Sequence, residues 1–253
     1  MQADQRRVHV GTSGWCYGHW REAFYPAGMA AREWLAYYAA RLDTVEVNSS
    51  FYRLPAPATL RAWGAVVPAD FIFSVKASRF ITHLKKLRDP AATLPPFLAR
   101  VDALKPRLGP ILFQLPPRWR LDLDRLRGFL ARLPEGFRYA FEFRDPSWWT
   151  EAVYEVLGSR GAAFCIHQLA GARAPGVVTC DFVYVRLHGP EAAYRGRYDE
   201  ASLAAWADAC REWAARGLKV YCYFDNDQAG YAAHNAVRMR AMLGQGVAIK
   251  RTT

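Results

Sequence analysis

The sequence predicts one α/β domain folded as an eight-stranded (β/α)8 TIM barrel. The chain has 253 residues, the usual size of a single barrel of this kind, and 52% of them are hydrophobic, which is enough for one large core. Eight short apolar segments recur along the chain, each about as long as a strand. Helical patterns lie between most of them. Strands that alternate with helices favour a parallel sheet, and eight such units favour its closure into a barrel.

The predicted strands are evenly distributed except at one interval. They cover residues 8–12, 44–48, 71–76, 110–114, 138–143, 162–167, 182–187 and 218–224. About fourteen residues separate the sixth strand from the seventh, and they include Gly171, Pro175 and Gly176. Because glycine and proline interrupt helices, we expect the sixth helix to be reduced to a turn or absent.

The clearest helix is predicted over residues 200–216. Asp199 can cap its N-terminus and Gly217 follows its end. Its apolar stripe contains Leu203, Trp206, Ala207, Cys210, Trp213 and Ala214. Pro57 is placed to begin a helix after the second strand.

Asp145 and Pro146 are expected to form the N-cap and first turn of a helix that carries Trp148 to Leu157. No change in composition along the chain indicates a linker. We therefore expect one domain over residues 1–253, with its core at about 8–243.

Composition excludes several classes of protein. Charged residues make up 23% of the chain and aromatic residues 14%, which excludes a disordered or low-complexity protein. Residues 1–7 are polar and lack the apolar segment of a signal peptide, and no apolar segment approaches the ~18 residues of a membrane span. The five cysteines are odd in number and show no C-x-x-C spacing, so neither a disulfide framework nor a zinc knuckle is indicated. We expect a cytoplasmic protein that does not associate with membranes.

Alternate residues of each predicted strand are apolar and would face the helices, so the residues between them would point into the barrel. At the C-terminal ends of the strands these inward residues are Ser13, Asn48, Lys76, Gln114, Arg144, His167, His188 and Asp225. One layer deeper they are Gly11, Glu46, Ser74, Leu112, Glu142, Cys165, Arg186 and Tyr223. Barrel interiors are normally filled by branched apolar residues, and unpartnered polar groups are costly to bury. The polar ring therefore predicts a site at the C-terminal mouth of the barrel.

The loops that follow the strands add aromatic and polar side chains to this mouth. An aromatic rim around a polar cup suits a small polar ligand that stacks, such as a sugar, a nucleoside or a phosphorylated metabolite. The predicted ligand contacts are Ser13, Trp15, Tyr17, Asn48, Tyr52, His83, Gln114, Arg144, Trp148, Arg186, Tyr194, Asp225, Asn226 and Asn235. The alternative is a polar network that satisfies itself and has no chemistry, with Glu46 paired to Lys76, and Glu142 paired to Arg144 or Arg186.

A series of ordered motifs in the sequence resembles the YecE-like family. The segments that carry the resemblance are Gly11–Trp15 with Phe24–Pro26, Glu46–Tyr52 with Pro55, Phe73–Ser78 with Thr82 and His83, Leu112–Pro117, Glu142–Arg144 with Trp148, Tyr184–Gly189, and Tyr223–Asn226 with Ala233, Asn235 and Ala236. The resemblance covers about residues 8–243. It implies a barrel fold with a polar pocket, and because the family is a domain of unknown function it implies no particular activity. Asp225 departs from the asparagine common at that position in the family.

General acid–base chemistry fits the ring best. Glu46 and Glu142 are the candidate acid and base, with His188 as a proton shuttle, and two carboxylates across a barrel also suit glycosidic cleavage. Lys76 is a candidate Schiff-base nucleophile, but an adjacent carboxylate would keep it protonated. We expect Arg144, Arg186 and Lys76 to clamp an anion. If Glu46 pairs with Lys76, and Glu142 with Arg186, then Arg144 keeps free donors that face the cavity.

No metal or other cofactor is expected. Glu46, Glu142, His167, His188 and Asp225 are the candidate metal ligands. The three cations Lys76, Arg144 and Arg186 share the same ring, and their charges would compete with a metal ion.

The favoured function is a hydrolase or lyase that acts on a small anionic or sugar-like molecule. The alternative is a nucleic-acid-binding or anion-binding protein. The net charge is +11, and residues 76–144 carry 15 basic and 6 acidic side chains, so most of the excess lies in one segment. Charged segments are more often solvated surfaces, so binding of nucleic acid is not favoured.

Overall fold

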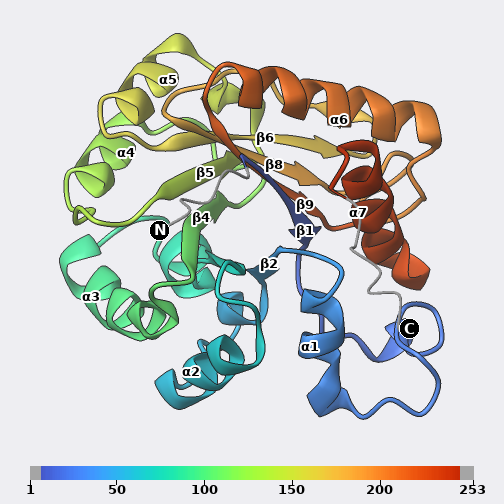
Figure 1. The fold of residues 1–253 in the computed structure, drawn as a ribbon. Coiled ribbons are helices and arrows are strands. Elements are labelled where there is room, and N and C mark those ends of the chain that lie inside the picture. Colours follow the sequence, from blue (N-terminus) through green and yellow to red (C-terminus); the bar gives the residue numbers. More distant parts are fainter. Residues whose placement is uncertain (1–6, 246–253) are drawn as a thin grey trace.

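A computed structural model describes residues 7–245 as an eight-stranded parallel barrel surrounded by helices (Figure 1). The expectation for the polar N-terminal segment concerns residues 1–6, which lie outside the described part of the chain. The barrel strands are β1 (Val8–Thr12), β2 (Thr44–Val47), β3 (Ile72–Lys76), β4 (Leu108–Leu115), β5 (Tyr139–Phe143), β6 (Ala163–Leu169), β8 (Phe182–Leu187) and β9 (Lys219–Phe224). The predicted fold class, a single-domain (β/α)8 barrel, is confirmed.

The barrel closes between β1 and β2. The other neighbours follow the order β1-β9-β8-β6-β5-β4-β3-β2, and a parallel bridge between Ser13 and Glu46 joins the two ends. The Gly14 N–H donates to the Glu46 carbonyl at 2.8 Å. A Cβ atom at Gly11 would lie 2.0 Å from the Thr44 carbonyl oxygen, so this close approach requires glycine.

No helix lies between β6 and β8, as the short interval predicts. The chain forms a two-residue strand there, β7 (Ala172–Arg173), which pairs antiparallel with the end of β6. Gly171 adopts a φ of +79° in the turn that precedes it, a conformation that glycine reaches without strain. The missing helix is thus replaced by a tight hairpin.

Seven α-helices in the described chain cover the outside of the barrel (Figure 1). They are α1 (Trp34–Ala39), α2 (Pro57–Val66), α3 (Pro90–Val101), α4 (Leu123–Leu130), α5 (Glu151–Gly158), α6 (Glu200–Ala215) and α7 (Tyr231–Met242). Short helical turns lie at Gly18–Trp20, Ala31–Glu33, Ser49–Phe51, Phe80–Leu84, Asp102–Leu104, Pro146–Trp148 and Gln228–Gly230.

Two of the predicted helix signals act as expected. Pro57 occupies the first turn of α2. The Asp199 side chain accepts a hydrogen bond from the Ser202 N–H at 2.7 Å at the start of α6, and Gly217 follows its end with a φ of +88°.

The helix expected to start at Asp145 is interrupted, so that prediction is wrong. Asp145 caps a single 3-10 turn, Pro146–Trp148, and α5 begins three residues later at Glu151. Trp148 is fully buried, stacks on Phe143 at 4.9 Å between ring centroids, and donates its indole N–H to the Trp119 carbonyl. The indole N–H of Trp149 donates a hydrogen bond to the Phe143 carbonyl. Anchoring both indoles to the core forces the backbone to turn between the two helical segments.

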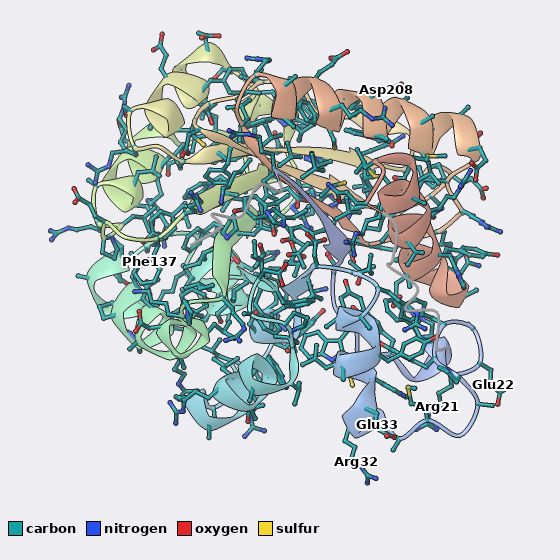
Figure 2. The ribbon with its side chains drawn as sticks, in the orientation of Figure 1. Arg21, Glu22, Arg32, Glu33, Phe137 and Asp208 are labelled. Atoms are coloured by element: carbon teal, nitrogen blue, oxygen red, sulfur yellow. The ribbon has the colours of Figure 1, made fainter. Side chains whose placement is uncertain are left out.

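The alternation predicted for the strands separates two cores. Outward side chains such as Val10, Phe73 and Val185 pack beneath the helices. The lower half of the barrel interior is a second cluster, made of Leu112, Ala140, Ala163, Cys165, Phe182, Tyr184, Tyr221 and Tyr223. Labelled charged residues such as Asp208 on α6 and Arg32 lie at the periphery and point away from the barrel (Figure 2). No helix within residues 7–245 is both long enough and apolar enough to cross a membrane, and the five cysteines are free thiols.

Candidate functional site

Arg186 of β8 is the centre of a buried charge network under the barrel mouth. The side chain is fully buried, and its Nη1 donates to Glu142 Oε2 at 2.7 Å. Its Nη2 donates to Glu46 Oε1 at 2.7 Å and to Asp225 Oδ2 at 3.0 Å. Ser13 Oγ also lies 3.0 Å from this nitrogen and donates to Glu46 Oε1 at 2.6 Å. One guanidinium therefore joins carboxylates from three different strand ends.

Glu142 is held as an anion in this network, and Glu46 is fully hydrogen-bonded beside it. Burial alone would raise the pKa of Glu142, but the charges of Arg144 and Arg186 and the contact with His188 keep it well below its usual range. The second oxygen of Glu46 accepts a hydrogen bond from the Tyr184 hydroxyl at 2.7 Å. Both side chains have no exposure to solvent.

His188 links Asp225 to Arg144. Its Nδ1 lies 2.9 Å from Asp225 Oδ2, and its Nε2 lies 3.0 Å from Arg144 Nη2 and 3.3 Å from Arg186 Nη1. Glu142 Oε1 also lies 3.3 Å from this Nε2. Because a carboxylate only accepts hydrogen bonds, Nδ1 donates to Asp225, whereas Nε2 faces two guanidinium groups and the Glu142 carboxylate together.

The predicted pairing of Glu142 is found, since Glu142 contacts both Arg144 and Arg186, but the pairing of Glu46 differs. Glu46 pairs with Arg186, so the expected ion pair between Glu46 and Lys76 is wrong. Arg144 Nε pairs with Glu142, and Arg144 Nη2 contacts His188 and lies 3.5 Å from the Tyr194 hydroxyl. The expectation that Arg144 keeps its donors free therefore fails for two of its three nitrogens. Among residues 7–245, Nη1 has no hydrogen-bond partner.

Lys76, at the end of β3, stands apart from this network. It is buried, with 8% of its surface exposed, and no hydrogen bond or ion pair within residues 7–245 involves its ammonium group. Nζ instead lies 4.4 Å from the centre of the Phe51 ring. Burial and then the charge of Arg186 lower the pKa of Lys76 to about 8, against the opposing effect of Asp225, Glu46 and Glu142. The three carboxylates still favour the ammonium form, as predicted, but burial and Arg186 outweigh them, so Lys76 is mostly protonated at pH 7 with a larger fraction of free amine than an ordinary lysine.

A cavity of about 350 Å³ opens above Lys76 at the barrel mouth. We call it the mouth cavity. Its walls are Tyr17, Asn48, Tyr52, Lys76, Tyr194, Asp225 and Asp227. Six of these seven residues were predicted from the sequence. They come from the ends of β2, β3 and β9 and from the loops after β1, β2, β8 and β9, so the mouth cavity lies where barrel enzymes hold their sites.

Asp227 is the wall residue that sequence reasoning missed. Its Oδ1 accepts a hydrogen bond from the Trp20 indole at 2.6 Å, and His19 Nε2 lies 3.2 Å from Oδ2. Burial raises the pKa of Asp227 to about 6, and the charge of Asp225 acts in the same direction. The signal was present, because residue 227 continues the inward alternation of Tyr223 and Asp225 beyond the end of the strand.

A larger cavity of about 590 Å³ lies beside the mouth cavity and shares three of its residues. This aromatic cleft is lined by Gly14, Trp15, Cys16, Tyr17, Asn48, Ser49, Tyr52 and Trp63. Trp15 and Trp63 meet edge to face at 4.8 Å between ring centroids. Trp15, Tyr17 and Tyr52 were predicted to contact a ligand, whereas Trp63 comes from α2 and gave no signal in the sequence.

Eight predicted ligand contacts line neither cavity, namely Ser13, Arg144 and Arg186 of the charge network, His83, Gln114, Trp148, Asn226 and Asn235. Trp148 is in the outer core, as described above. Asn226 and Asn235 are buried and joined by a hydrogen bond of 3.0 Å. Asn226 also donates to the Gly196 carbonyl and Asn235 to the Tyr198 carbonyl. These two asparagines therefore brace the loop that carries Tyr194 against α7, and they do not line the mouth.

His83, Gln114 and His167 lie at or just after the ends of β3, β4 and β6. His83 lies in the π-helical turn Phe80–Leu84 and meets the Phe51 ring at 4.9 Å, and burial followed by the charge of Lys76 lowers its pKa to about 4. His167 and Gln114 are buried at their strand ends. Burial lowers the pKa of His167 to about 4, so this ring is neutral at pH 7. Within the described residues, no three His, Cys, Asp or Glu side chains are arranged to hold a metal ion.

The basic segment 76–144 forms much of the surface of α3 and α4 and is partly neutralised there. Lys85 pairs with Asp89 at 2.9 Å and Lys105 with Asp102 at 2.6 Å. Arg125 and Arg127 each pair with an aspartate three residues earlier at 3.4 Å. Such local surface pairs are typical of a solvated face.

The barrel fold has a counterpart among known proteins. Residues 9–253 match the family described as "Protein of unknown function DUF72". The chain belongs to this family. Its YecE-like character, predicted from the sequence motifs, is confirmed.

Two curated proteins and one solved structure are similar to this DUF72 chain. UPF0759 protein YunF of Bacillus subtilis (strain 168) is 26% identical over 273 residues, which span 93% of this chain and 94% of YunF. UPF0759 protein YecE of Escherichia coli (strain K12) is 31% identical over 158 residues, which span 61% of this chain and about half (54%) of YecE. The crystal structure of a DUF72 family protein from Thermotoga maritima superposes with a TM-score of 0.84 at 29% identity, covering 94% of this chain and 100% of that one.

Proposed function

We propose that this DUF72 protein is an enzyme of hydrolase or lyase type that binds a small polar, anionic molecule in the mouth cavity. The observation that carries the proposal is that a lysine without an ion pair and a partly buried aspartate, Lys76 and Asp227, line the same cavity at the C-terminal end of a barrel. Concave sites with convergent groups of this kind are the usual location of chemistry in this fold.

The two groups suit proton transfer near neutral pH. Lys76 has a pKa of about 8 and Asp227 a pKa of about 6, so one can donate a proton and the other can accept one. Glu46 and Glu142, the acid and base predicted from the sequence, are fully buried and bonded to Arg186. We assign these two glutamates a positioning role, in which they fix Arg186 and, through Asp225, the floor of the mouth cavity.

The expected ligand combines an anionic group with a ring. The Lys76 ammonium lines the mouth cavity, and Arg144, whose Nη2 lies 3.5 Å from the hydroxyl of the wall residue Tyr194, keeps Nη1 as a second donor for a phosphate or carboxylate. The adjoining aromatic cleft offers indole and phenol faces on which a sugar or a base can stack. A sugar phosphate or a nucleoside phosphate has both features.

The test measures ligand binding and turnover by the whole chain. Ribose 5-phosphate, a nucleoside monophosphate and inorganic phosphate are titrated, with thermal stabilisation and calorimetry as readouts. We expect Arg144→Ala to weaken binding about 10-fold, because a charge-assisted hydrogen bond is lost. Asn48→Ala should weaken it less while leaving the charge network intact. Bond cleavage in the same panel is followed by NMR, and Asp227→Asn should slow it about 100-fold.

Arg127→Ala is the matched surface control, because Arg127 lies on α4 with 57% of its side chain exposed. This variant should bind the panel as the wild type does. Equal loss of binding in Arg127→Ala and Arg144→Ala would instead favour the basic surface of α3 and α4 as the anion site, and with it the nucleic-acid-binding alternative.

A further inference from the structure

We infer that Lys76 is a nucleophile that forms a Schiff base with an aldehyde or ketone carried by an anionic ligand. This inference rests on the proposed function and narrows it to a lyase that acts on a carbonyl compound. Four observations support it: the position of Lys76, its missing partners, the charges around it, and the groups available for proton transfer.

Lys76 is placed where a nucleophile of a barrel enzyme is expected. It is the last residue of β3, and its side chain lines the mouth cavity although little of it is exposed. The backbone at this point is held by the Ser50 hydroxyl, which donates to the Lys76 carbonyl at 2.6 Å. The amine therefore projects from a rigid strand end into a space large enough for a small molecule.

A buried lysine with a purely structural role is normally paired with a carboxylate. Lys76 has no such pair among residues 7–245, although three carboxylates lie in the same half of the barrel. Arg186 binds all three of them, Glu46, Glu142 and Asp225, through hydrogen bonds of 2.7 to 3.0 Å. The molecule thus contains acceptors that could pair with this ammonium, and it uses them elsewhere.

The charges that face Lys76 come from four strands. Arg186 of β8 opposes the ammonium form, whereas Glu46 of β2, Glu142 of β5 and Asp225 beyond β9 favour it. With burial added, the net effect lowers the pKa to about 8. This leaves roughly 100-fold more free amine at pH 7 than an ordinary lysine with a pKa of ~10.4 has. Free amine is the reactive form in imine formation.

The reaction balances without any redox step. The Lys76 nitrogen lone pair forms a bond to the carbonyl carbon while the carbonyl π electrons move to the oxygen, and one proton passes from nitrogen to oxygen to give a neutral carbinolamine. The hydroxyl group takes up a second proton and leaves as water, the nitrogen lone pair forms the carbon–nitrogen double bond, and loss of the last nitrogen proton returns the proton that was used. Asp227 can carry the proton from nitrogen to oxygen, because its pKa of about 6 lets it accept and return a proton near neutral pH.

Reductive trapping tests the inference on the intact chain. The protein is treated with cyanoborohydride and either formaldehyde, which reaches any accessible amine, or glyoxylate, an anionic aldehyde. Reduction of the imine adds the mass of the aldehyde less one oxygen atom, and peptide mass spectrometry locates it. We expect Lys76 to be modified at least about 10-fold faster than Lys105 at pH 7, because it has more free amine. Glyoxylate should show the larger preference.

Lys105 is an internal control, since it is exposed and paired with Asp102 on the surface. Lys76→Arg keeps the positive charge but cannot form an imine, so it should lose the adduct and retain stabilisation by inorganic phosphate. Modification of Lys76 no faster than Lys105 with both aldehydes would overturn the inference, even if Lys76→Arg fails to fold. If phosphate still bound while Lys76 reacted no faster than Lys105, the proposed anion site would be supported and the Schiff base would be rejected.

Discussion

The two halves of the barrel interior are built from the same strands and differ completely in chemistry. The lower half is a cluster of apolar and aromatic side chains in which Tyr223 makes neutral hydrogen bonds of 2.7 Å with Thr44 and Ser74. The upper half holds three carboxylates and two guanidiniums in contact with one another. Both halves are excluded from solvent. They differ in what offsets the cost of burying their polar groups: neutral hydrogen bonds in the lower half and ion pairs in the upper half.

The contrast shows which groups of the mouth are candidates for chemistry. Burying an ion is favourable only when its partners replace the water that it loses. Arg186 and its three carboxylates meet that condition, and they behave as a charged equivalent of the apolar cluster below. Lys76 and Asp227 lie just above and do not meet it fully, which is why their pKa values move toward neutrality.

Replacing Arg186 should have the largest effect on the stability of the upper half. Arg186→Met removes the cation shared by three buried carboxylates, leaving Glu142 with Arg144 and His188, Asp225 with His188, and Glu46 with neutral donors, and should destabilise the fold by about 3–5 kcal/mol at pH 7. In the wild type, the lowered pKa values of Glu142 and Asp225 add stability that is present above pH ~4 and is lost as the pH falls through the lowered values. In the variant, burial raises those pKa values, so its deficit should shrink as the pH falls. Urea unfolding at pH 7 and at lower pH measures this difference.

Leu112→Ala is the matched change in the lower half and should cost about 2–5 kcal/mol at either pH, because it creates a cavity without a charge. If the loss of stability in Arg186→Met were also independent of pH, then ionised carboxylates could not be what Arg186 stabilises in the upper half.

Two tyrosines allow a finer comparison across the boundary between the halves. The Tyr184 hydroxyl donates to the charged Glu46 at 2.7 Å, whereas the Tyr223 hydroxyl meets neutral hydroxyl groups. Tyr184→Phe should therefore cost about 2 kcal/mol and Tyr223→Phe about 1 kcal/mol, because hydrogen bonds to charged groups are the stronger ones. Chemical denaturation of both variants at pH 7 gives the two values, and a reversed order would contradict the assignment.

The smallest expected effect is a gain in stability. Lys76 has its pKa lowered from 10.5 to about 8 in the folded chain, so folding is opposed by the buried ammonium below pH 8 and this penalty disappears as the pH rises toward 10.5. Lys76→Met should stabilise the protein by about 1 kcal/mol at pH 7 and by less at higher pH. Urea midpoints at pH 7 and 9.5 measure the gain. A loss of stability at pH 7 would identify Lys76 as a structural residue.

The strands and the orientation of their side chains could be predicted from the sequence because both depend on local patterns. An alternation of period two decides which residues of 182–187 face inward, and the short interval before that segment predicts the missing helix. These features need no knowledge of what lies across the barrel.

The pairings inside the barrel could not be predicted in this way. Glu46 could reach Lys76 or Arg186 as far as the sequence shows, and the choice depends on the stagger of eight strands. Aromatic and amide side chains after strand ends are equally ambiguous, since Trp148 turned back into the core while Tyr194 remained at the mouth. Asp227 was within reach of sequence reasoning but lies beyond the last predicted strand residue, where the alternation was not extended.

The absence of a side chain at Gly11 has a consequence for the whole barrel. An added methyl group would collide with the Thr44 carbonyl, so β1 and β2 could not approach closely enough to join the ends of the sheet. Ser13 and Glu46 bridge the same seam two residues further on, and both contact Arg186. The contact between β1 and β2 therefore determines both how the barrel closes and where Arg186 is held. A widened seam would move Glu46 away from the guanidinium and disturb the electrostatic balance of the mouth without any change to the residues that line it.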